Sequence, residues 1–318
     1  MGFESLLGNE RLKENLTAAL RRGHISHFYL ISGPEGSGKH TLARLLAAGI
    51  LCGQPDAPCQ TCRVCRRVLS DVHPDVITLE DKEKKTVSVE LVRKAREDVY
   101  IRPNEAEYKI YLLPRAQDMS IAAQNALLKV LEEPPPYGVF LLLTDNPNKM
   151  LPTIRSRCME LALQALPEDV LLPRLRREFP QAEEERLRGA MQRGGGFLGQ
   201  ARELLARGEG VTPQTAAFSQ GFAARDAMQL LSVLAPMEKW KRDALLPELG
   251  QWLEILEGAL ACRGGMAAAS QYARSLASAR SAYDLSQAVD SLKKAMEYTQ
   301  GNVSPAAVCG WLSWALRR

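Results

Sequence analysis

Residues 27–41 read HFYLISGPEGSGKHT, a short apolar run that passes directly into a glycine-rich turn. The apolar run, His27–Ser32, predicts a buried strand, and a helix is expected to begin where the turn ends. At such a junction backbone N–H groups converge on phosphates, and a lysine at the helix start reaches the outer phosphates. The stretch therefore predicts a phosphate-binding loop in an α/β fold. Its candidate nucleotide-binding residues are Gly33, Gly36, Gly38, Lys39, His40 and Thr41.

One position in this loop departs from the usual pattern. The residue after the lysine normally supplies a hydroxyl group to Mg²⁺, whereas here it is His40, and Thr41 comes one step late. The departure disfavours Mg²⁺ more than it disfavours a bare phosphate. Lys39 favours a bound ATP or ADP and His40 opposes it, so the residues leave nucleotide binding open. A glycine-rich turn without a ligand is the alternative interpretation.

Nucleotide hydrolysis also needs acidic residues at the end of a second strand, to hold Mg²⁺ and to orient water. The candidate strand, Lys109–Leu113, runs instead into Pro114 and Arg115. Proline has no side-chain ligand for a metal, and arginine stays protonated and cannot act as a general base. Asp118 comes several residues later, and we expect its side chain to face elsewhere. The pattern predicts a nucleotide-hydrolysis fold whose chemistry has been removed.

Short apolar runs alternate with amphipathic helical stretches up to about residue 165. This alternation predicts a parallel, right-handed α/β sheet that is buried on both faces. The other candidate strands are Asp75–Leu79, Lys109–Leu113, Gly138–Thr144 and Cys158–Leu163. Three short helices are expected over 166–210 and further helices over 211–318. Asn9 and Ser304 are the expected N-caps of the first and last helices.

Four of the seven cysteines, Cys52, Cys59, Cys62 and Cys65, fall within one short stretch. An odd total argues against a disulfide framework, whereas two-residue spacings let a chain turn back on a tetrahedral Zn²⁺. An iron–sulfur cluster is the first rival, because the spacing also opens the bacterial ferredoxin pattern. After its third cysteine that pattern has three residues, a further cysteine and a proline. Here Cys65 is followed by Arg66, Arg67, Val68 and Leu69, so the pattern is not completed. We predict a closed structural zinc site, with an iron–sulfur cluster or free thiols as alternatives.

Length, composition and charge narrow the class of protein. A chain of 318 residues is expected to form two or three domains, and 46% hydrophobic with 25% charged residues is typical of globular proteins. The net charge of +4 is compatible with phosphate contacts and far below that of a polycation. No apolar run is long enough to span a membrane, and the start of the chain lacks a signal-peptide pattern. A cytoplasmic protein is expected.

Together these features resemble the clamp loader of bacterial DNA polymerase III, a family of AAA+ proteins, and within it the delta prime subunits. The likeness is dense up to about Leu163 and looser beyond. It is carried by the strand and phosphate loop, the place of the cysteine cluster, His73-Pro74-Asp75, the run AQNALLKVLEEPP at 123–135, Ser156-Arg157-Cys158, and Asn302-Val303-Ser304-Pro305.

The resemblance implies an architecture. We expect an AAA+ (RecA-like) domain over 1–165 with an inserted zinc module at 52–65, a small three-helix lid over 166–210, and an all-α collar domain for oligomerisation over 211–318. It also implies a subunit of an ATP-driven hetero-oligomer that opens a sliding clamp and loads it on primer–template DNA. The implied partners are motor subunits of the gamma or tau type, a delta subunit, the clamp, and DNA contacted through its phosphates.

Within the family, the arginine of the Ser-Arg-Cys motif acts in trans on nucleotide held by a neighbouring subunit. The resemblance gives this role of arginine finger to Arg157, where a fork of donors would neutralise charge in the transition state. A surface arginine that caps the following strand is the alternative.

Three functions remain to be weighed. The first is a non-hydrolysing clamp-loader subunit, the second an ATP-hydrolysing subunit of the gamma or tau type, and the third a zinc-dependent nucleic-acid-binding module. Pro114 and Arg115 disfavour the second, and Gly199 stands where motor subunits carry a lid arginine. The modest charge disfavours the third. We predict the first, with no ATPase activity of its own.

Overall fold

In this computed structural model, which describes residues 2–80, 87–206, 211–266, 270–301 and 303–317, five parallel strands form one sheet. Their order is β2-β3-β4-β1-β5, so the strand that leads into the phosphate loop lies between β4 and β5. All five strands expected from the sequence are present, and three are one or two residues shorter than expected. They are β1 (Phe28–Ser32), β2 (Val76–Thr78), β3 (Lys109–Leu113), β4 (Gly138–Thr144) and β5 (Met159–Ala162).

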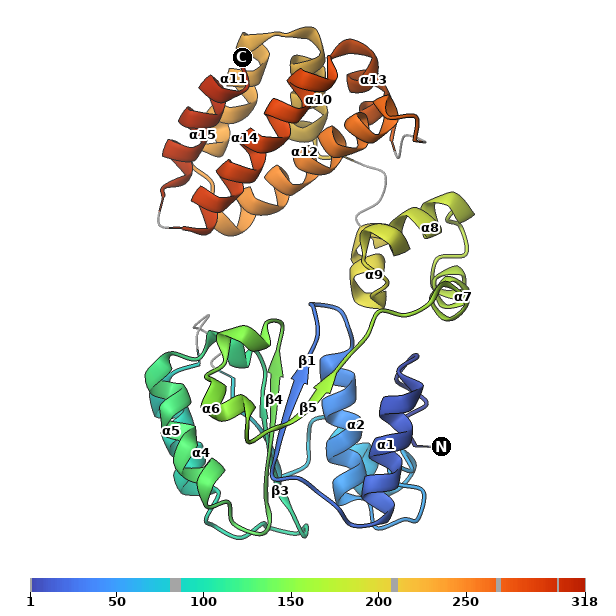
Figure 1. The fold of residues 1–318 in the computed structure, drawn as a ribbon, viewed down its shortest axis with the longest axis vertical. Coiled ribbons are helices and arrows are strands. Elements are labelled where there is room, and N and C mark those ends of the chain that lie inside the picture. The colour runs from blue at the N-terminus through green and yellow to red at the C-terminus, as the bar shows by residue number, and fades with distance from the viewer. Residues whose placement is uncertain (1, 81–86, 207–210, 267–269, 302, 318) are drawn as a thin grey trace. The chain divides into compact units, whose positions relative to one another are not determined.

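Both faces of the sheet are buried under helices (Figure 1). Successive side chains of a strand point to opposite faces, so Tyr29 and Ile31 pack on one side and Phe28 and Leu30 on the other. The first side carries α1 (Glu10–Arg21), α2 (Lys39–Leu51) and α3 (Arg63–Leu69). The second carries α4 (Val89–Asp98), η1 (Ala116–Asp118), α5 (Ile121–Glu132), η2 (Pro147–Lys149) and α6 (Pro152–Arg155). This three-layer arrangement is the one expected from continuous apolar strands.

Three more helices follow β5: α7 (Glu168–Glu178), α8 (Glu184–Arg193) and α9 (Leu198–Ala206). Glu178 of α7 accepts two hydrogen bonds of 2.5 Å from Arg202 of α9, which ties these two helices together. These helices belong with the sheet to a compact unit, Met1–Leu204, and the rest of the chain forms a second unit, Leu205–Arg318. The expected boundary at 210 lies outside the described residues, so the three-part domain division stays a prediction.

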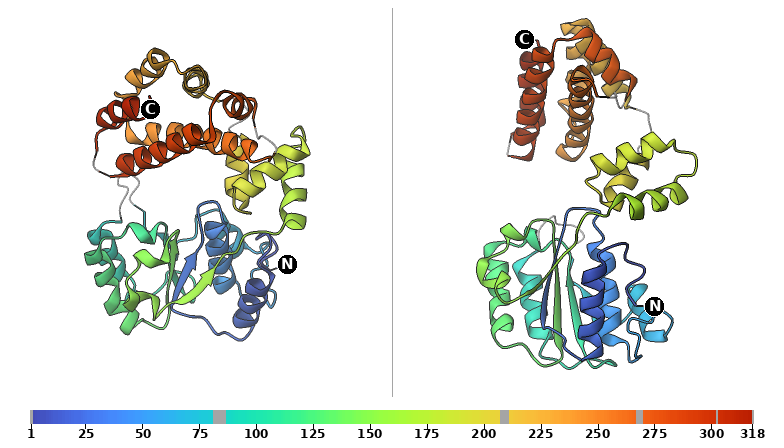
Figure 2. Two further views of the ribbon diagram at one scale, coloured as in Figure 1. Left: turned by 45° about the horizontal axis from the view of Figure 1, so that its top comes forward. Right: turned by 45° about the vertical axis from the view of Figure 1, so that its right-hand side comes forward.

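The second unit is helical (Figure 2). Trp252 lies at its centre, fully buried, with its ring stacked on that of Phe218 at 4.1 Å between centroids. The buried side chain of Glu248 accepts hydrogen bonds from Trp252 and Thr215, so its oxygen has donors within the core. The helices are α10 (Pro213–Ala224), α11 (Ala227–Met237), α12 (Arg242–Arg263), α13 (Gln271–Ala279), α14 (Ala282–Gln300) and α15 (Pro305–Ala315). Among the described residues, no helix is both long and apolar enough to cross a membrane.

The two expected helix caps have different outcomes. The hydroxyl group of Ser304 accepts a hydrogen bond of 3.3 Å from the N–H of Ala307, as a side-chain N-cap does. Asn302, from the same motif, lies outside the described residues. Asn9 holds the expected N-cap position of α1, and its carbonyl accepts from the N–H of Lys13 at 3.1 Å. Its side chain makes no cap, because Oδ1 accepts instead from the N–H of Gln164 at 2.9 Å. The position is thus as expected, and the side-chain bond is not formed.

Candidate functional site

The phosphate loop joins the carboxyl end of β1 to the first turn of α2, in the place that the sequence predicts. Gly33, Gly36 and Gly38 have φ angles of 154°, 74° and 99°, values that side-chain-bearing residues rarely adopt. The N–H of Gly33 donates to the carbonyl of Thr144 at 3.2 Å, which anchors the loop to the neighbouring strand β4. The loop therefore lies at the carboxyl edge of the sheet, where open α/β sheets bind ligands.

Lys39 is folded back into the loop and is only 8% exposed. Its Nζ donates to the carbonyls of Gly33 at 2.7 Å and Pro34 at 2.9 Å, and to Oδ1 of Asp145 at 2.5 Å. A lysine ammonium group has three N–H donors. All three are used within the protein, and the charge is neutralised by the Asp145 carboxylate.

Asp145 was missed by the sequence reasoning, which placed no acidic residue beside the loop. It directly follows β4, and because β4 neighbours β1 it emerges at the same edge of the sheet. Gln117 holds it in place: Nε2 donates to Asp145 Oδ2 at 3.1 Å, and Oε1 accepts from the Asp145 N–H at 3.2 Å. A polar residue after a buried strand was the available signal, but using it requires the strand order.

The remaining candidates near the loop do not converge on a metal site. His40 and Thr41 are both exposed. At the end of β3, Pro114 is buried, while Arg115 is exposed and forms an ion pair with Asp118 at 2.6 Å from both Nε and Nη2. Asp118 is thus engaged in neutralising Arg115.

The four cysteines of the cluster come together around the end of α2 and the start of α3. Cys52 ends α2, Cys62 caps α3, and all four Sγ atoms lie within 4.8 Å of one another. A tetrahedral Zn²⁺ with arms of about 2.3 Å has edges of about 3.8 Å. The Sγ atoms of Cys59 and Cys65 are 3.9 Å apart, so this pair matches such an edge. The donor set and its spacing fit zinc.

Hydrogen bonds and burial act on these thiols in opposite directions. The N–H groups of Cys62 and Thr61 point at Cys59 Sγ and lower the pKa of that thiol to about 6. Burial raises the pKa of Cys52 and Cys65. A bound Zn²⁺ would supply the positive charge that holds the buried thiols as thiolates.

Arg157 lies in the turn between α6 and β5. Its side chain is 43% exposed, its Nη1 donates to the carbonyl of Thr153 at 3.1 Å, and its Nη2 is 3.9 Å from Oε1 of Glu132. Arg157 precedes β5, whereas the phosphate loop follows β1, and these two strands are parallel neighbours. Arg157 therefore lies at the amino end of the strands and the loop at their carboxyl end. The length of β5, about 3.3 Å per residue, separates them. Arg157 is therefore not placed to act on its own phosphate loop.

Gln124 on α5 fixes the chain that leads to this arginine. The side chain is 3% exposed. Its Oε1 accepts from the N–H of Leu151 at 2.8 Å, and its Nε2 donates to the carbonyls of Lys149 at 3.2 Å and Met119 at 3.3 Å. The amide thus joins α5 to the start of α6. The sequence singled out the run that contains Gln124, but not this contact.

In the His-Pro-Asp motif, Asp75 holds the loop at residues 104–106 through hydrogen bonds. Asp75 is fully buried, and its two oxygens accept from the N–H groups of Asn104 at 2.6 Å, Glu105 at 2.9 Å and Ala106 at 3.0 Å. The side-chain amide of Asn104 adds a fourth bond at 2.9 Å. Burial alone would raise the pKa of Asp75, but these donors outweigh it and the pKa is lowered.

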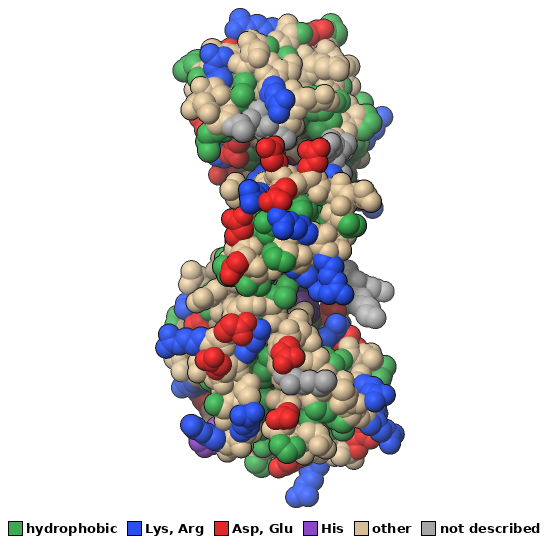
Figure 3. Space-filling view, turned by 90° about the vertical axis from the view of Figure 1, so that its right-hand side faces the viewer, with side chains coloured by type: hydrophobic (Ala, Val, Ile, Leu, Met, Phe, Trp, Pro, Cys, Tyr) green, Lys and Arg blue, Asp and Glu red, His purple; other side chains and the backbone are tan. Residues whose placement is uncertain are grey.

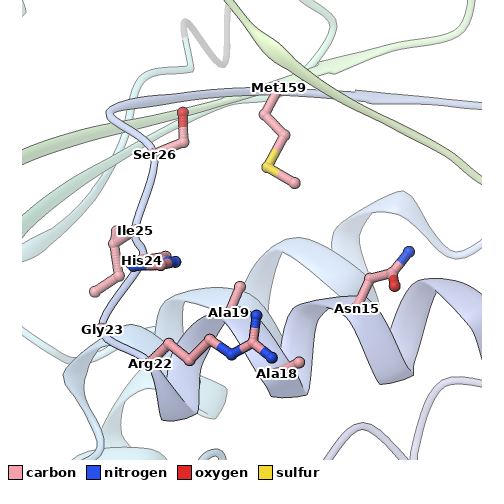
Figure 4. A pocket seen from close by; sticks show the side chains of 9 residues that line it. All are labelled: Asn15, Ala18, Ala19, Arg22, Gly23, His24, Ile25, Ser26 and Met159. Atoms are coloured by element: carbon pink, nitrogen blue, oxygen red, sulfur yellow. The ribbon is translucent and has the colours of Figure 1, made fainter.

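A groove of about 710 Å³ opens between α1 and the start of β5 (Figure 4). Asn15 lines it from α1, Arg22 and His24 line it from the connection between α1 and β1, and Met159 points into it from β5. Of its lining residues, Met159 lies close in sequence to Arg157. The groove thus adds polar and apolar surface to the sheet edge that carries Arg157.

Charged side chains of both signs are mixed on the side of α7 and α8 (Figure 3). Arg188 pairs with Glu168 at 3.1 Å and with Glu184 at 2.9 Å, and Arg176 pairs with Glu184 at 2.5 Å. These two exposed arginines therefore have acidic partners within the protein.

Gly199, in the first turn of α9, lies directly against the phosphate loop. Its N–H donates to the carbonyl of Gly36 at 3.0 Å. A Cβ atom placed on Gly199 would be 2.4 Å from the Cα of Gly36, closer than real Cβ contacts. At Gly199, where motor subunits are expected to carry an arginine, the backbone of α9 is thus in direct contact with the backbone of the loop.

Comparison with known proteins agrees on one group. The family described as "DNA polymerase III, delta subunit" matches residues 8–167. The DNA polymerase III delta' subunit of Pseudomonas aeruginosa is 34% identical over 73% of this chain and 70% of its own length. The tau subunit of Bacillus subtilis is 34% identical over 54% of this chain, and the chain spans less than half the length of the tau and gamma proteins it matches.

A solved structure supports the same fold. The DNA polymerase III gamma subunit-related protein of Thermotoga maritima aligns with 95% of this chain and 99% of its own, at a TM-score of 0.51 and 18% identity. At that identity the likeness concerns the fold alone.

Proposed function

This chain belongs to the DNA polymerase III delta subunit family of clamp-loader proteins, and we propose that within it the chain is a non-hydrolysing subunit of the delta prime type. Similarity alone does not separate this type from the tau type, since both relatives are 34% identical. The residues at the carboxyl end of β3 support the delta prime type. The proposal rests above all on Pro114 and Arg115, which follow β3 where hydrolysis needs a metal-binding acid and a base.

The state of the loop lysine supports the same proposal. Lys39 would have to reach the outer phosphates of a nucleotide, yet its three donors bond to the loop carbonyls and Asp145. Asp145 does bring a carboxylate to the loop, but Lys39 and Gln117 occupy both of its oxygens. A Mg²⁺ ion bound there would have to displace one of these partners.

We further propose that Arg157 acts on a neighbouring subunit's nucleotide. Two observations support action in trans. Arg157 lies at the end of the strands opposite to its own phosphate loop. Its side chain is exposed and makes only a loose 3.9 Å contact with Glu132. An arginine fork so exposed can extend to a phosphoryl group and neutralise charge there. The matching partners are gamma- or tau-type motor subunits and a delta subunit, with residues 211–318 as the collar of the assembly.

The remaining proposals concern zinc, the clamp and DNA. Cys52, Cys59, Cys62 and Cys65 would hold one Zn²⁺ in a closed site without an open coordination position, which stabilises the chain between α2 and α3 and performs no catalysis. The assembly would load a sliding clamp, and DNA would be contacted through its phosphates. Within the described part of the chain, the iron–sulfur and nucleic-acid-module interpretations gain no support beyond the cysteine spacing.

The test of the proposal uses the isolated chain and a reconstituted loader. We expect no ATP turnover from the isolated chain above background, and normal turnover and clamp loading when it is combined with motor and delta subunits. Turnover by the isolated chain that disappears in a Lys39→Ala variant would assign it to the motor type instead. The matched control is Lys13→Ala, which removes a lysine that pairs with Glu10 on α1, outside the phosphate loop.

A further inference from the structure

The contact between Gly36 and Gly199 excludes a side chain from both positions. A Cβ atom on Gly199 would lie 2.4 Å from Cα and 2.8 Å from the carbonyl oxygen of Gly36. A Cβ atom on Gly36 would lie 2.7 Å from the backbone nitrogen of Gln200. All of these atoms belong to the backbone, so no side-chain rotation relieves the overlap. Helix α9 and the loop can meet this closely only because both residues are glycines.

Backbone conformation does not explain the glycine at 199. Gly36 has a φ of 74°, which by itself favours glycine. Gly199 lies in the first turn of α9 and has no positive φ, so its backbone conformation is one that any residue can adopt. What requires glycine there is the contact with the loop.

Further bonds hold each side of this contact. On the loop side, Lys39 is bound by two loop carbonyls and Asp145. On the helix side, Arg202 binds α9 to Glu178 of α7 through two hydrogen bonds. The loop is thus joined through α9 to the helices that follow β5.

We propose that the Gly36–Gly199 contact is a latch that keeps the phosphate loop and α9 closed on each other without nucleotide, so that a nucleotide must open the latch to bind. The inference goes beyond the proposed function, because it concerns whether the loop is closed before nucleotide binds and not whether the nucleotide is hydrolysed. The latch itself needs no partner subunit and is tested on the isolated chain, without an activity assay.

The experiment is hydrogen exchange of the full chain, followed by mass spectrometry on segments 33–41 and 197–204. We compare the wild type with Gly199→Ala and with a matched control, Gly189→Ala, on α8, where a Cβ atom would meet nothing within 4 Å. Gly199→Ala is expected to speed exchange of both segments together by about tenfold, as loss of a hydrogen bond and its contact does. Gly189→Ala is expected to leave both unchanged. Unchanged exchange of 33–41 in Gly199→Ala would overturn the latch.

A second arm uses ADP as the probe and covers the case in which Gly199→Ala fails to fold. In the wild type, both segments are expected to exchange slowly without ADP, and any bound ADP is expected to speed exchange of 197–204 as the latch opens. Exchange of these segments at the rate of an unstructured peptide would overturn the proposal. So would ADP binding that leaves 197–204 fully protected. ATP turnover, by contrast, would contradict the proposed function and leave the latch standing.

Discussion

Replacing Asp75 with asparagine tests the buried hydrogen bonds that hold the loop at residues 104–106. The two carboxylate oxygens accept four N–H groups, two each, from the loop at residues 104–106. The asparagine side chain would keep the shape but replace one oxygen by an NH₂ group that faces two donors. Two hydrogen bonds to a charged acceptor are lost, each contributing about 1.5–3 kcal/mol. We therefore expect Asp75→Asn to lower the free energy of unfolding by about 3–6 kcal/mol.

The assay can separate the two units of the chain. All four tryptophans, Trp240, Trp252, Trp311 and Trp314, belong to the second unit. Urea unfolding followed by tryptophan fluorescence reports that unit, while far-UV circular dichroism reports both. Asp75→Asn should shift the circular dichroism transition to lower urea and leave the fluorescence transition in place.

Asp71→Asn is the matched control, because Asp71 forms an exposed ion pair with Arg44 and asparagine tolerates its φ of 57°. An exposed pair contributes little, so a loss below about 0.5 kcal/mol is expected. The stabilisation by Asp75 is expected to decrease in acid, because its pKa is lowered in the folded protein. It is fully present above the unfolded pKa of about 4 and is lost as the pH falls through the folded pKa. The difference between wild type and Asp75→Asn should therefore shrink in acid. If both variants lose the same free energy of unfolding at neutral pH, the stabilising role of the Asp75 hydrogen bonds is refuted.

Three further outcomes are expected. The purified chain should be colourless and contain about one Zn²⁺, and Cys62→Ser should lower its zinc content while Cys262→Ser does not; visible absorption would indicate iron instead. Arg157→Ala should leave the loader assembled but slow its ATP turnover and clamp loading, with Arg157→Lys rescuing poorly; full activity would make Arg157 a strand cap. Gln124→Met should cost about 1–3 kcal/mol, because the Leu151 N–H is left without its acceptor, and thermal unfolding of the variant measures this.

The sheet could be predicted because its three central strands, β1, β3 and β4, are buried and mostly apolar runs. The edge strand β5 was the weakest of the five signals, and in the structure only Leu161 of that strand is buried. The cysteine cluster was also readable, since its ligands are close in sequence and their spacing carries the geometry. Both features depend on local order, which a sequence displays directly.

What could not be predicted depends on residues that are distant in sequence. Lys39 meets Asp145, and Gly36 meets Gly199, only because the strand order and the path of α9 bring them together. Asn9 illustrates the same limit at a helix end, because its side chain accepts from the distant Gln164 N–H and not from the helix that it precedes. A cap motif states what a side chain can bind locally, and tertiary structure decides which donor it binds.

The pairing of Gly36 with Gly199 has an evolutionary consequence. Because each glycine forbids a side chain on the other, a mutation at either position is judged by selection in the context of its partner. An arginine at position 199 would need α9 to stand away from the loop, so this substitution alone would disrupt the contact. The two positions are therefore expected to change together, and a chain of this fold with a side chain at 199 would need a different path for α9.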